Sequence, residues 1–216
     1  MSGKLKALGL GLLAALAVSA TAGVNASAEV SGHFVVDGEH AVVVVSEGGA
    51  HRVKFSASGL TGAIECLENS YSGVIGAQTV AGFTVTPTFK TCRTEGSATH
   101  NVTITTNGCR YTFKATEKTH ATFWLLCDVG SFLEIHHPNC TIKIPGQTNL
   151  SGVSYTTVVE NGKHALTADF TVENIAVQYE AGICTFLGTN NKGAMKGSLT
   201  LRATDTVGNP VNVTVT

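Results

Sequence analysis

Apolar and polar residues alternate with a period of two along much of this chain. The alternation is clearest in the segments CRYTFKA (109–115), CTIKIPG (140–146), ADFTVEN (168–174), SLTLRAT (198–204) and VNVTVT (211–216). Successive side chains of a strand point to opposite faces, so the pattern predicts strands with one buried face. Gly, Asn, Asp and Ser interrupt the pattern at the short intervals that turns require.

Two other segments are apolar without interruption. Val43–Val45 and Phe123–Leu126 form continuous apolar runs, which are typical of strands covered on both faces. After residue 28 no 3.6-residue period is found, so no helix is predicted there. The whole pattern predicts an all-β fold, an antiparallel β-sandwich or barrel with about a dozen strands.

One hairpin can be predicted together with its register. A turn at Glu117–Thr119 places three pairs of residues on one face of the hairpin: Cys109 with Cys127, Tyr111 with Leu125, and Phe113 with Phe123. This register buries aromatic side chains and brings two sulfurs together. The opposite face then holds Arg110, Thr112, Lys114, Thr122 and Trp124.

Trp124 is the only tryptophan, and its position allows two interpretations. A lone tryptophan in a small β protein is usually a core residue, which predicts that Trp124 packs beneath a second sheet. Alternatively, Trp124 with Arg110 beside it forms a surface site that stacks on a sugar ring or on an aromatic residue of a partner.

The six cysteines predict disulfide bonds. An even number of cysteines in an exported chain is typical of a disulfide framework. The chain has no C-x-x-C or C-x-x-H spacing, so no zinc site is predicted. Six cysteines allow 15 connectivities. Pairing of nearest neighbours is favoured because each pair then brackets a hairpin or short meander: Cys66 with Cys92, Cys109 with Cys127, and Cys140 with Cys184.

Residues 1–28 have the pattern of a secretory signal peptide. Lys4 and Lys6 precede a short apolar stretch, and small residues stand before possible cleavage points after Ala28 or, alternatively, Ala22. The apolar stretch is shorter than the roughly 20 residues that span a bilayer. We therefore expect a secreted, extracellular protein without a membrane anchor after cleavage.

Residues 29–216 are expected to form one β domain, with a possible soft seam near residues 95–100. With 43% hydrophobic and 13% charged residues, the chain can bury a core. Fourteen basic residues face 15 acidic ones, and cleavage removes two lysines, so no basic surface for nucleic acid is expected.

Four segments carry a resemblance to known proteins: TPTFKTC (86–92), TTNGCRYTF (105–113), CTIKIPGQ (140–147) and YEAGIC (179–184). In these segments the chain resembles a group of secreted actinobacterial proteins of unknown function. The resemblance implies a secreted, disulfide-bonded β protein and no particular activity. Separately, ATDTVGNPVNVTV (203–215) is similar to the closing hairpin of bacterial Ig-like domains.

The segment EIHHPNC (134–140) is the strongest local candidate for chemistry. Adjacent His136 and His137 point to opposite faces of a strand, so they cannot share one metal ion there. Glu134 and His136 do share a face, but no third ligand is identifiable. We therefore predict a polar strand end at this place, and neither a metal nor another cofactor.

No catalytic motif is present, neither a G-x-S-x-G elbow, nor H-E-x-x-H, nor a phosphate loop. We therefore expect a secreted, non-catalytic β domain with a binding, surface or structural role, whose partner is an unknown extracellular ligand or protein. The alternative is a secreted hydrolase whose site is assembled from scattered His and carboxylate residues, for example His164 and Asp169 with a serine.

Overall fold

The computed structural model describes residues 32–38, 42–48, 53–56, 63–138, 140–182 and 188–216. The expected signal peptide and Cys184 lie outside these residues. Every element in the described part is a strand. The strands are β1 (Phe34–Val36), β2 (Val42–Gly48), β3 (Val53–Ser56), β4 (Ile64–Ile75), β5 (Thr79–Val80), β6 (Gly82–Thr94), β7 (Thr103–Thr105), β8 (Arg110–Glu117), β9 (His120–Leu126), β10 (Leu133–His137), β11 (Cys140–Ile144), β12 (Gln147–Glu160), β13 (Lys163–Gly182), β14 (Gly188–Thr204), β15 (Pro210–Val211) and β16 (Val213–Val215).

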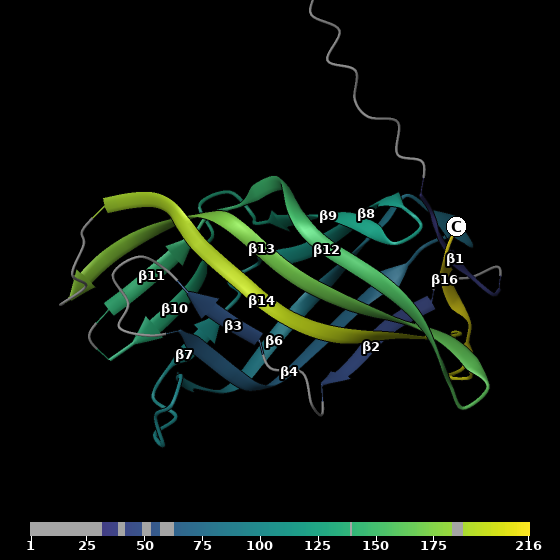
Figure 1. Cartoon of the computed structure of the whole chain (residues 1–216), viewed down its shortest axis with the longest axis horizontal. Coiled ribbons are helices and arrows are strands. Elements are labelled where there is room, and N and C mark those ends of the chain that lie inside the picture. Colours follow the sequence, from purple (N-terminus) through teal and green to yellow (C-terminus); the bar gives the residue numbers. More distant parts are fainter. Residues whose placement is uncertain (1–31, 39–41, 49–52, 57–62, 139, 183–187) are drawn as a thin grey trace, which may run out of the picture.

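The strand pairings form a closed circuit. The order β14-β2-β4-β6-β8-β9-β12-β13 returns to β14, because β13 also pairs with β14, and every pairing is antiparallel. The prediction of an antiparallel all-β fold is confirmed, and the sheet closes as a barrel. In Figure 1 the strands β12, β13 and β14 cross in front of β4 and β6.

At the end of the molecule that holds β7, β10 and β11, the long strands pair with other strands. The last residues of β13 pair with β11, which leads to β10 and then β7. Val102, the residue before β7, forms an isolated bridge with Cys92 of β6 and so completes a second circuit. Strand β3 fills the place between β14 and β4. Four strands, β4, β6, β13 and β14, therefore belong to both circuits.

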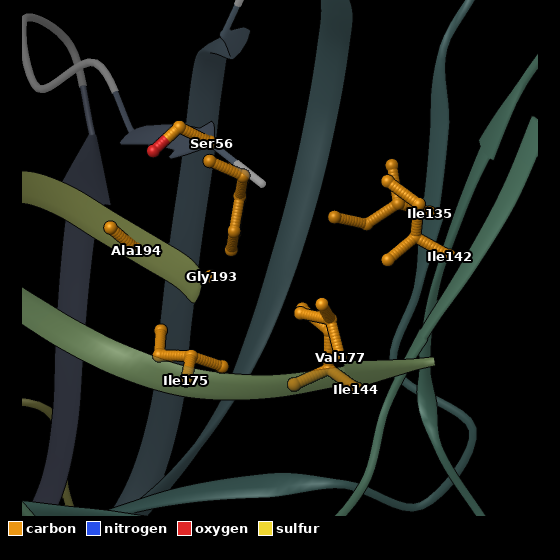
Figure 2. A pocket seen from close by; sticks show the side chains of 9 residues that line it. Ser56, Ile135, Ile142, Ile144, Ile175, Val177, Gly193 and Ala194 are labelled. Atoms are coloured by element: carbon orange, nitrogen blue, oxygen red, sulfur yellow. The ribbon is translucent and has the colours of Figure 1, made fainter. Parts of the chain in front are cut away.

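The interior is filled with apolar side chains. A three-stranded sheet of β16, β1 and β5 contributes Phe34, whose ring lies 4.7 Å from that of Phe83 and 5.4 Å from that of Tyr155. Toward the other end, Figure 2 shows isoleucine and valine side chains converging on a cavity of only about 10 Å³. That volume is close to the minimum for a single water molecule.

Two of the three predicted disulfides are confirmed. Cys66 is bonded to Cys92 and Cys109 to Cys127, and no described cysteine is a free thiol. The third predicted pair includes Cys184 and stays a prediction. The two disulfides indicate that the chain folds in an oxidising environment, as extracellular proteins do.

The predicted register of the β8–β9 hairpin is also confirmed. Tyr111 faces Leu125 and Phe113 faces Phe123. The turn differs from the prediction, because the register shifts after Ala115 and Glu117 pairs with His120. This bulge leaves only Lys118 and Thr119 in the turn.

A side chain replaces a strand where β12 separates from β13. Strand β12 pairs with β13 only as far as Val153↔Phe170, whereas β11 pairs with β13 from Gln178 onward. In the gap, the amide of Gln147 accepts from the backbone N of Ala176 at 2.8 Å and donates to its carbonyl oxygen at 3.1 Å. Gln147 therefore satisfies two backbone groups that no strand reaches.

We expect Gln147→Leu to lower the free energy of unfolding by about 2 kcal/mol, because it leaves both backbone groups of Ala176 without that partner. Urea unfolding followed by far-UV circular dichroism measures the loss. Gln78→Leu is the control, since Gln78 is exposed, and its effect should stay within about 0.5 kcal/mol. Equal effects of the two variants would contradict this role of Gln147.

Candidate functional site

Trp124 lies on the outer face of the β8–β9 hairpin. It pairs with Thr112 and is half-buried, and the neighbouring Leu126 is 36% exposed. The expectations that Trp124 packs beneath a second sheet, and that the run 123–126 is covered on both faces, are therefore wrong. The register required for the Cys109–Cys127 bond turns Trp124 and Leu126 outward.

A lysine covers the Trp124 ring. Lys114 Nζ lies 3.4 Å from the ring centroid, a cation–π contact. A sugar stacking on that face of the ring would first have to displace Lys114. Arg110 lies on the same outer face, but its Nη2 donates to Asp128 Oδ1 at 2.9 Å. The structure therefore places the candidates Trp124 and Arg110 on one face, where Trp124 already contacts Lys114 and Arg110 already pairs with Asp128.

The second predicted group, Glu134 and His136, lies on the outer face of β10. His136 Nε2 is 3.2 Å from Glu134 Oε2, and Lys143 Nζ lies 3.7 Å from Glu134 Oε1 and 2.7 Å from Glu180 Oε2. The hydrogen bond to Glu180, followed by the charges of Glu180 and Glu134, raises the pKa of Lys143. The group is a surface network of opposite charges.

His137 points away from this network, as predicted. Its Nε2 lies 3.2 Å from Thr94 Oγ1, whereas His136 Nδ1 lies 3.4 Å from Thr141 Oγ1. Within the described residues no three His, Cys, Asp or Glu side chains are grouped so that they could hold a metal ion.

We expect His136→Ala to change the free energy of unfolding by no more than about 0.5 kcal/mol. The imidazole is 44% exposed, and exposed ion pairs contribute little. Thermal unfolding at pH 7 measures the effect. A loss of more than 1 kcal/mol would show that the network stabilises the sheet in a way that surface ion pairs usually do not.

A cleft that no sequence motif predicts opens between the first residues of β13 and the last residues of β14. The β13–β14 ladder ends at Leu166↔Leu201, and beyond it β15 pairs with Ala203 and Thr204 instead. The separation leaves a cavity of about 110 Å³. In Figure 1 the C-terminus and the β12–β13 hairpin lie at the same end of the molecule. The cavity is lined by Glu160, Asn161, Lys163, His164, Ala165, Arg202, Ala203, Thr204, Pro210 and Val211.

Charged side chains form the rim of this cleft. Arg202 Nε donates to Glu160 Oε2 at 2.5 Å. Lys163 and His164 are exposed, and within the described part of the chain neither side chain has a hydrogen-bonding or ionic partner. Two permanent cations therefore face one carboxylate, and the cleft carries a local positive charge on a chain whose formal net charge is −1.

Short polar contacts lie next to the residues that line the cleft. The backbone N of His164 donates to Asn212 Oδ1 at 2.8 Å, and Asn212 Nδ2 donates to Asp37 Oδ2. In the turn between β14 and β15, Asp205 accepts from the side chain and the backbone N of Asn209, at 2.9 and 2.8 Å. These bonds, the one to the Asn209 side chain foremost, lower the pKa of the Asp205 carboxyl. The turn that follows Thr204 is thus held by hydrogen bonds to the carboxylate form of Asp205.

The suggested triad is not assembled in the structure. His164 lines the cleft, but Asp169 lies five residues farther along β13, roughly 17 Å away at the usual rise per residue. Glu160 and Lys163 face each other across the turn between β12 and β13. Only the parting of β13 from β14 brings these residues to Arg202.

The comparisons with known proteins add no relative. No protein-family model, no curated protein and no solved structure matches this chain. The resemblance to secreted actinobacterial proteins therefore stays a prediction. Among the described residues no helix has the length and apolar character that a membrane span requires.

Proposed function

We propose that the chain is a secreted, non-catalytic binding module that holds a small group of an extracellular ligand in the cleft between β13 and β14. The observation that carries the proposal is the contrast between the cleft and the interior. The cleft has about 110 Å³ of open volume and exposed polar groups, whereas two cavities in the apolar interior have about 10 Å³ each.

The volume also limits what the cleft accepts. Sites for whole drug-sized ligands usually measure about 300–1,000 Å³. A site of about 110 Å³ fits one terminal or branching group of a larger molecule, which remains outside the protein. The disulfide-braced closed sheet supports this proposal, because a rigid scaffold lowers the entropy lost on binding.

A fragment screen by two-dimensional ¹H–¹⁵N NMR on the full mature chain tests the proposal. We expect saturable shifts confined to the amides of Lys163–Ala165 and Arg202–Thr204, and of Val211. Fragments that bind elsewhere, or no saturable binding at the cleft, would overturn it.

The hydrolase alternative concerns the same cleft, because His164 and Glu160 both line it. Incubation with chromogenic esters and glycosides separates the two functions. We expect no turnover above that of the buffer. Turnover that disappears in a folded His164→Ala variant would replace the binding proposal with the hydrolase.

A further inference from the structure

Arg202 has hydrogen-bond donors that the protein itself does not use. Its Nε is bonded to Glu160, and among the described residues its two Nη groups donate to no other group. The Glu160 contact holds the planar guanidinium in one orientation at the rim. A guanidinium fixed in this way presents two parallel N–H donors, which matches the two oxygens of a carboxylate.

Lys163 adds a second cation at the same rim. It stands beside Asn161 and Gly162, whose φ values of 51° and 76° form the tight turn that joins β12 to β13. Because Glu160 pairs directly with Lys163 across this turn, the ammonium group and the Arg202–Glu160 pair lie at the same end of the hairpin. An anion in the cleft would meet two cations and one carboxylate.

The rest of the lining distinguishes a carboxylate from a phosphate. Phosphate sites usually offer several converging backbone N–H groups. In this cleft the N–H of His164 is already bonded to Asn212, and in the adjoining β14–β15 turn those of Val207 and Asn209 are bonded to Asp205. The remaining walls, from Ala165, Ala203, Pro210 and Val211, are apolar. They suit the carbon atoms next to a carboxylate.

We infer that the cleft binds a terminal carboxylate on a short apolar or sugar body, with Arg202 and Lys163 as its cationic partners. This inference rests on the proposed binding function and names the ligand class of that site. Such a carboxylate occurs at the C-terminus of a peptide and on a uronic acid, and the two sources present the same chemistry to Arg202.

Matched pairs of probes test the inference by NMR titration of the full mature chain. N-acetylalanine and glucuronate carry the carboxylate, whereas N-acetylalaninamide and methyl glucoside are their neutral counterparts, and inorganic phosphate is the third arm. We expect at least one carboxylate to bind at the cleft at least tenfold more tightly than its neutral counterpart and than phosphate. The carboxylate that binds identifies the source.

Arg202→Met should weaken binding of the carboxylate probe at least tenfold, because hydrogen bonds that involve charged groups are stronger than those between neutral groups. Lys163→Met, at an exposed position, should weaken it severalfold and serves if Arg202→Met fails to fold. Arg110→Met is the matched control, because Arg110 is also an exposed arginine paired with a carboxylate, and it should leave binding unchanged.

The failures of the two proposals can be told apart. Equal binding of carboxylates and neutral counterparts at the cleft, tighter binding of phosphate, or full affinity in folded Arg202→Met and Lys163→Met would overturn the carboxylate inference and leave the binding function. If no probe and no fragment binds at the cleft, both the carboxylate inference and the proposed binding function are overturned.

Discussion

Gly152→Ala is expected to lower the free energy of unfolding by about 4 kcal/mol or to prevent folding. A Cβ at residue 152 would lie 2.0 Å from the carbonyl oxygen of Thr171, which is backbone and cannot swing away. The φ of Gly152 is +102°, a conformation that L side chains rarely adopt. The clash and the backbone strain add together. Chemical unfolding followed by circular dichroism, or the yield of soluble protein, measures the loss.

Gly130→Ala is the control for the backbone conformation alone. Gly130 has a φ of +78°, and a Cβ there meets no atom within 4 Å. Its replacement should cost only the strain of the left-handed region, about 1–2 kcal/mol. If Gly152→Ala costs no more than Gly130→Ala, the close approach of β12 to β13 at Thr171 is not a constraint on the fold.

Arg93→Met is expected to lower the free energy of unfolding by about 3 kcal/mol. Arg93 Nε lies 2.9 Å from Glu65 Oε1, and the exposed fractions of the two side chains are 22% and 4%. Removal of the arginine takes away the hydrogen bond and the charge that Arg93 gives to a buried carboxylate, and such a loss is far larger than the value of an exposed pair. Urea unfolding at pH 7 measures it.

Two further variants separate burial from charge. Arg110→Met breaks an ion pair in which both side chains are about half exposed, and it should cost less than 1 kcal/mol. Glu65→Met combined with Arg93→Met should restore most of the lost stability, because an apolar pair can replace a buried ion pair. A double variant as unstable as Arg93→Met would contradict this explanation.

The parts of the fold that were predictable from sequence are local ones. The β8–β9 register followed from residues within one hairpin, because a single alignment buried Tyr111 and Phe113 and brought Cys109 to Cys127. The opposite orientations of His136 and His137 followed from the alternation of side chains along a strand. Nearest-neighbour pairing of Cys66 with Cys92 likewise needed only two adjacent strands.

The remainder depends on contacts between distant residues. The cleft exists because the ladder between β13 and β14 ends at Leu166↔Leu201, and a sequence pattern does not show where two strands part. The gap bridged by Gln147 also arises where two strands part, here β12 and β13. Trp124 was misjudged because the apolar run 123–126 resembles a doubly covered strand, whereas the side chain that covers its ring is Lys114, from the neighbouring strand.

The sharing of β4, β6, β13 and β14 between the two circuits has a consequence for how the molecule opens. Each of these strands is paired on both sides over much of its length, and a fragment that lacks either end of the molecule would leave one of them with an unpaired edge. Local opening at one end therefore leaves each of the shared strands paired at the other end. Their slowest-exchanging protons should exchange with solvent only through global unfolding, at one common free energy, so that the two ends form a single cooperative unit.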